Sequence, residues 1–97
     1  MFVIGVTSCA TGIAHSYMSA AAIQKAAKKR GYKVKVEIQG SMGIENALSP
    51  KEIAEADLII FANDVGISKM ERFANVEEKI KRLKPHEVIK NAEIIFE

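Results

Sequence analysis

Two short and almost wholly apolar runs, FVIGV at residues 2–6 and LIIFA at 58–62, most constrain what this chain can fold into. Strands that are buried on both faces show such runs, and they occur in parallel sheets with helices on both sides. Between the two runs, residues 13–30 are rich in alanine and lead into Lys-Lys-Arg-Gly at 28–31, a common end of a helix. Strand, helix and strand in this order predict an α/β domain.

The first predicted helix is expected to place one apolar face on the sheet. The residues at helical spacing that we expect on this face include Ile13, Tyr17, Ala20, Ala21 and Ala27.

Two further elements follow from local patterns. The run KVKVEI at 33–38 alternates strictly, which predicts an edge strand with one buried face and one face in water. The run Ser-Pro-Lys-Glu at 49–52 combines an N-cap, a proline at N1 and a capping-box glutamate. We therefore expect a short helix that continues to about Ala56.

The C-terminal third is ambiguous on periodicity alone, because residues 79–84 fit either a helix or a fourth strand. Residues 86–96 carry an apolar face and predict a terminal helix. The pair Gly40 and Gly43 indicates a turn, since a GxxG pair alone is weak evidence of a phosphate site.

The composition predicts one soluble domain over residues 1–97, with 48% hydrophobic and 27% charged residues. A net charge of +2 and 6% aromatic residues argue against binding to nucleic acid. No apolar run approaches the roughly 18 residues that span a bilayer, and the first basic residue is Lys25, so we expect neither a membrane span nor a leader. A single cysteine fits a reducing cytoplasm.

That cysteine, Cys9, follows the first predicted strand, at the edge of the sheet where ligands of such folds bind. Residues 10–14 bring mostly small side chains and one glycine, so their N–H groups can surround an anion at the positive end of the first helix. The positive end of the helix also favours a thiolate, the nucleophilic form of cysteine. A nucleophile beside an anion site predicts a phosphocysteine, whereas the alternative is a small buried hydrophobic residue.

Four segments distributed along nearly the whole chain carry a family resemblance: SCATGIAHSYM, VEIQGSMGIEN, LSPKEIAEADLIIFANDVGISKMERF and KPHEVIK. They resemble the fructose-type enzyme IIB domain of the bacterial phosphoenolpyruvate:sugar phosphotransferase system. The loop of that family typically reads C-P-T-G-I-A-H-T, so Ala10 replaces its proline and Ser16 its second threonine, while the other positions match.

The resemblance implies a fold, a function and partners. The fold is a single three-layer α/β domain with a four-stranded parallel sheet in the order 2-1-3-4 and helices on both faces, which favours a strand over 79–84. The function is a phosphoryl relay in sugar uptake: Cys9 accepts a phosphoryl group from a histidine of enzyme IIA and passes it to a sugar, fructose by the family's type. The membrane enzyme IIC holds that sugar, so the domain is expected in the cytoplasm at the inner face of the membrane. No metal or organic cofactor is needed.

The predicted phosphate-binding loop is the run after Cys9: Ala10, Thr11, Gly12, Ile13, Ala14, His15 and Ser16. His15 either contacts phosphate or orders the first turn of the helix. The hydroxyls of Thr11 and Ser16 suit anion contact and helix capping equally.

Two residues outside the loop are candidate partner contacts. Asp64 follows the third predicted strand, and its alternative role is to form a turn. Arg72 lies in the sequence ERF, and its alternative is a solvated position.

Two other classes of function remain open. Low-molecular-weight tyrosine phosphatases have a similar sheet and a C-x5-R loop whose arginine holds the phosphate oxygens. His15 takes the place of that arginine here, so we expect slow hydrolysis and favour the relay. The third class is a non-enzymatic anion-binding domain with a structural cysteine.

Overall fold

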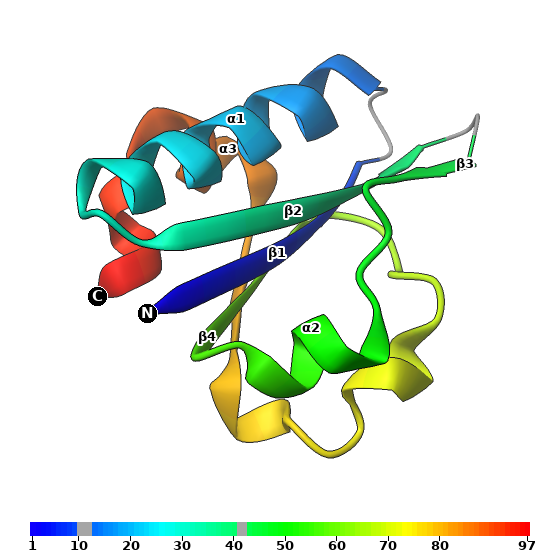
Figure 1. Cartoon of the computed structure of the whole chain (residues 1–97). Coiled ribbons are helices and arrows are strands. Elements are labelled where there is room, and N and C mark those ends of the chain that lie inside the picture. Colours follow the sequence, from blue (N-terminus) through cyan, green and yellow to red (C-terminus); the bar gives the residue numbers. More distant parts are fainter. Residues whose placement is uncertain (10–12, 41–42) are drawn as a thin grey trace.

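The computed structural model describes residues 1–9, 13–40 and 43–97. A sheet separates two layers of helix (Figure 1), and its strand order is β3-β2-β1-β4-β5. The strands are β1 (Phe2–Ser8), β2 (Lys33–Gly40), β3 (Gly43–Glu45), β4 (Leu58–Asn63) and β5 (Ile80–Leu83). Strands β2, β1, β4 and β5 run parallel, whereas β3 pairs antiparallel with β2.

Helices cover both faces of the sheet, as the sequence predicts. One layer holds α1 (Ile13–Lys29), α3 (Pro85–Lys90) and the 3-10 turn η3 (Ala92–Phe96). The other layer holds α2 (Pro50–Glu55) and the 3-10 turns η1 (Met70–Phe73) and η2 (Glu77–Lys79).

The helix ends form where the local signals place them. Gly31 adopts a φ of +77° just after α1, and its N–H donates to the carbonyl of Lys28 at 2.9 Å. The predicted capping box of α2 is present, since Ser49 N–H donates to Glu52 Oε1 at 2.9 Å and Glu52 N–H donates to Ser49 Oγ at 3.2 Å. The expected short helix is thereby confirmed.

A hydrophobic core lies on each side of the sheet, which explains why β1 and β4 are apolar on both faces. The core under α1 includes Ile23 and Ile60. The core under α2 includes Phe61 and Phe73, whose rings pack edge to face with 4.9 Å between the ring centroids. Gly5 lets α1 approach β1, because a Cβ there would lie 3.3 Å from Ile60 O and 3.4 Å from Ile23 Cδ1.

The four predicted strands are confirmed as parallel and keep their predicted relative order, with residues 80–83 forming β5. The prediction of a four-stranded, wholly parallel sheet is wrong, because β3 makes the sheet five-stranded and mixed. β3 has only three residues, too few for a period to appear, and Gly43 pairs with Gly40 in the antiparallel register.

The prediction that the second strand has one face in water is also wrong. Glu37 and Gln39 lie on the face opposite Val36 and are buried, because α2 and the segment 64–73 cover that face. Lys35, on the same face, binds the two carboxylate oxygens of Glu52 at 2.9 and 3.0 Å. An alternating pattern identifies the polar face of a strand. It does not show whether the polar side chains on that face contact water or buried polar groups of the protein.

Two helix predictions need correction. Tyr17 and Ala21 are exposed on α1, whereas Ser16 and Ser19 are buried. The terminal helix predicted over 86–96 is broken: α3 ends at Lys90, Asn91 adopts a φ of −151°, and the rest is the 3-10 turn η3.

Candidate functional site

Cys9 follows β1 at the carboxyl end of the parallel strands and is half-buried. Its neighbour Ser8 lies in register with Gln39 of β2 and Asn63 of β4. The first turn of α1 begins at residue 13, so the positive end of this helix belongs to the same edge of the sheet. The structure thus brings the thiol to the edge where ligands of such sheets bind.

The first turn of α1 holds the rest of the predicted loop that the structure describes. Ala14 and His15 are exposed, and His15 O accepts a hydrogen bond from Ser19 Oγ at 2.9 Å. Ser16 is buried and makes a side-chain hydrogen bond with Cys9. The predicted loop residues Ala10, Thr11 and Gly12 and the side chain of Ile13 lie outside the described residues.

The electrostatic surroundings of Cys9 differ from the prediction. Burial raises the pKa of the Cys9 thiol, the hydrogen bond from Ser16 lowers it, and the negative charge of Asp64 raises it, with a net rise. The raised pKa disfavours the thiolate in the free protein, contrary to the expectation from the sequence.

Asp64 lies at the predicted edge, directly after β4. It is exposed, and its N–H donates to Ser8 O at 3.1 Å. A partner contact at Asp64 stays a prediction.

Arg72 is largely buried and pairs with Glu37 inside the domain. Its guanidinium donates to Glu37 Oε1 at 2.8 Å and to Glu37 Oε2 at 2.9 Å, and it also donates to Leu48 O at 3.1 Å. The alternative of a solvated Arg72 is therefore wrong, and its partner contact stays a prediction.

Sequence reasoning missed the polar cluster around Glu37, which is fully buried. Burial alone would raise the pKa of Glu37, but the hydrogen bonds from Arg72, Leu48 N–H and Gln39 outweigh it, and the net pKa is lowered. Gln39 also binds Ser68: its amide oxygen accepts from Ser68 N–H at 2.8 Å, and Nε2 donates to Ser68 O at 3.1 Å. No sequence signal links Glu37 to Arg72, because they are 35 positions apart.

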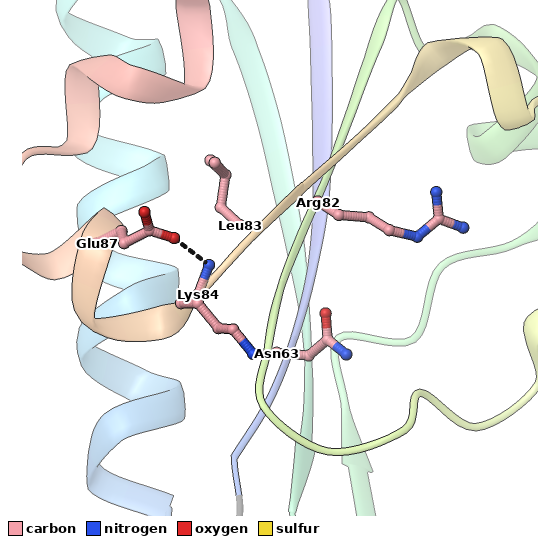
Figure 2. A pocket seen from close by; sticks show the side chains of 5 residues that line it. All are labelled: Asn63, Arg82, Leu83, Lys84 and Glu87. Carbon is pink, nitrogen blue, oxygen red and sulfur yellow. Dashed lines mark hydrogen bonds between the residues drawn. The ribbon is translucent and has the colours of Figure 1, made fainter.

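A groove of about 330 Å³ opens at the same edge of the sheet, next to β5, and is lined by Asn63, Arg82, Leu83, Lys84 and Glu87 (Figure 2). Lys84 extends toward Asn63, and Glu87 Oε1 accepts the N–H of Lys84 at 2.9 Å. Asn63 connects this groove to β1, because it lies in register with Ser8.

Neither a membrane-spanning helix nor a metal-binding cluster occurs in the described part of the chain. No helix there is long and apolar enough to cross a membrane. Within the same residues, no three histidine, cysteine or acidic side chains gather in a way that would hold a metal ion.

The fold and the site define a class: a doubly wound α/β domain with a thiol at the carboxyl end of its first strand, before the first helix. The family model described as "PTS system, Lactose/Cellobiose specific IIB subunit" matches residues 4–97. The "PTS system fructose-like EIIB component 2" of Escherichia coli K12 is 45% identical over 94 residues, which is 97% of this chain and 87% of that relative. The chain belongs to the enzyme IIB family of the sugar phosphotransferase system, and the resemblance to its fructose type is confirmed.

Further comparisons agree with this assignment. The solution structure of an enzyme IIB subunit from Escherichia coli K12 matches with a TM-score of 0.88 at 38% identity, over 97% of this chain and 85% of that chain. The "Fructose-like PTS system EIIBC component" of the same organism is 40% identical over 97% of this chain, which is 20% of the relative. The YwlE arginine phosphatase matches with a TM-score of 0.53 at 16% identity over 89% of this chain and 71% of that chain, a likeness of fold alone.

Proposed function

We propose that this enzyme IIB component carries the phosphoryl group on Cys9, which receives it from a phosphohistidine of enzyme IIA. Cys9 then passes it to a sugar, fructose by the type of its relatives, that the membrane enzyme IIC holds. The observation that carries the proposal is the position of Cys9: at the end of β1, beside the first turn of α1 and hydrogen-bonded to Ser16.

In the first step the sulfur of Cys9 attacks phosphorus, so an S–P bond forms and the P–N bond to the donor imidazole breaks. The imidazole nitrogen needs a proton when the phosphoryl group leaves, and the thiol supplies it. The raised pKa of Cys9 supports this order of events, because a thiol with a raised pKa retains its proton more readily until the donor arrives. In the second step a sugar hydroxyl attacks phosphorus, the S–P bond breaks, and the hydroxyl proton returns to sulfur.

Enzyme IIC as the acceptor partner is supported by relatives whose names join the two components, such as the "Fructose-like PTS system EIIBC component". We infer that the domain works in the cytoplasm, held at the inner face of the membrane by enzyme IIC. The backbone N–H groups near the start of α1, including those of Ala14 and His15, are suited to stabilise the transferring group.

The test is incubation with a fructose-type enzyme IIA phosphorylated on its histidine, followed by intact mass measurement and peptide mapping under conditions that preserve thiophosphate. We expect one phosphoryl group, on Cys9, and none in Cys9→Ser. Labelling of Cys9→Ser at wild-type stoichiometry would contradict the proposal. Efficient hydrolysis of an aryl phosphate by the purified chain, without transfer from enzyme IIA, would favour a phosphatase instead.

A further inference from the structure

The segment of residues 64–69 lies across the carboxyl end of β1. It leaves β4 at Asn63 and reaches β2 at Ser68, and β1 lies between those two strands in the sheet. Cys9 is the residue that follows β1, so this segment borders the thiol.

The segment is fixed at both ends. At its start, Asp64 N–H donates to Ser8 O at 3.1 Å. At its far end Ser68 exchanges two hydrogen bonds with Gln39, and Lys69 O accepts from Arg72 Nε at 3.0 Å. Lys69 adopts a φ of +59°, a left-handed conformation that side chains rarely take, so this end is held against a local preference.

The Glu37–Arg72 pair supports this far end. The side chain of Arg72 is 14% exposed and that of Glu37 is 0% exposed, and both guanidinium Nη atoms donate to the carboxylate. A buried ion pair is weak evidence for stability, because apolar residues of similar size are often as stable. The better-attested role of a buried ion pair is to select one conformation of the surrounding chain over alternative conformations.

We propose that the Glu37–Arg72 pair is a positioning device, which seats segment 64–69 so that the carboxylate of Asp64 is held beside Cys9. The proposal deepens the proposed function, since it names residues that set the state of the phosphoryl-accepting thiol. Among the described residues, the groups that act on Cys9 are Ser16 from α1 and Asp64 after β4. Arg72 is not among the groups that act directly on Cys9, and its own charge is paired with Glu37, so in this proposal it affects the thiol by seating segment 64–69.

The test follows alkylation of Cys9, the only thiol in the sequence, by iodoacetamide over a pH range that extends well above the ordinary thiol pKa of about 8.5. Asp64→Asn should move the midpoint of reactivity to lower pH, because it removes a negative charge that raises the pKa of Cys9. Glu37→Gln with Arg72→Met should move it in the same direction without leaving a buried charge. Adding this double change to Asp64→Asn should produce no further shift.

An unchanged midpoint in a folded Glu37→Gln/Arg72→Met variant would overturn the proposal, and so would a shift that adds to that of Asp64→Asn. Arg82→Met is the matched control, because Arg82 is also an arginine near a phenylalanine ring but pairs with the exposed Glu77 at 3.9 Å rather than with Glu37. The alkylation assay uses no phosphoryl donor. A negative result would therefore contradict the positioning role of the Glu37–Arg72 pair without contradicting phosphorylation of Cys9.

Discussion

Replacing Arg72 by methionine should destabilise the domain by about 3–5 kcal/mol at neutral pH, the usual result of removing one partner of a buried ion pair. The carboxylate of Glu37 is fully buried, and without Arg72 its remaining hydrogen-bond donors among the described residues are Leu48 N–H and Gln39 Nε2. Leu48 O and Lys69 O also lose a donor. Domains have about 5–15 kcal/mol of stability in total, so the variant should be marginally folded.

The loss should depend on pH in a defined direction. In the wild type the pKa of Glu37 is lowered, so its contribution is present above its unfolded pKa of about 4.3 and is lost as the pH falls through the folded value. Without Arg72, burial raises the pKa of Glu37, and the stranded carboxylate binds a proton more readily. The difference between the two proteins should therefore be largest near neutral pH and narrow as the medium becomes acidic.

Urea unfolding at neutral pH and near about pH 4.5 measures both effects, provided that the m-value is unchanged. Arg82→Met is the control: its side chain is 58% exposed and lies 3.9 Å from Glu77, so its loss should stay within about 0.5 kcal/mol. The reasoning fails if Arg72→Met is as mild as this control, or if its loss is equal at both pH values.

Two further predictions concern β1 and the thiol. Gly5→Val should destabilise the domain by about 1–3 kcal/mol in thermal unfolding, because even a Cβ would lie 3.3 Å from Ile60 O; a melting temperature equal to that of the wild type would contradict this. Ser16→Ala should raise the pKa of Cys9 further, because it removes a hydrogen bond that lowers it, and should move the midpoint of alkylation to higher pH. A midpoint at or below the wild-type value would show that Ser16 has no such role.

The features that follow from local sequence were predictable. The apolar runs of β1 and β4 require cover on both faces, and the capping box of α2 needs only four adjacent residues. β3 was not predictable from a pattern, because three residues carry no period and its pairing depends on the end of β2. The break at Asn91 was missed because an apolar face continues from α3 into η3 across a change in helix type.

The position of the candidate site was predictable, but its electrostatics were not. Topology alone places Cys9 at the carboxyl edge, since every parallel strand of such a sheet ends there. The direction of its pKa depends on burial and on Asp64, which is 55 positions away by sequence numbering and reaches the thiol only in the folded chain. The same holds for Glu37, whose polar face was identified but whose cover comes from α2 and residues 64–73.

In the proposed relay Asp64 acts on Cys9 both before and after phosphoryl transfer, and this connects the Glu37–Arg72 pair to the chemistry. Before transfer, a negative charge beside Cys9 disfavours the thiolate, so the sulfur keeps the proton that the donor imidazole requires. After transfer, the same carboxylate lies near a phosphocysteine that carries more negative charge than a thiolate, and the repulsion raises the free energy of that intermediate. A less stable phosphocysteine is a better donor to the sugar hydroxyl. In this proposal Asp64 therefore disfavours ionisation of the free thiol and favours onward transfer, which suits a relay that must release what it accepts.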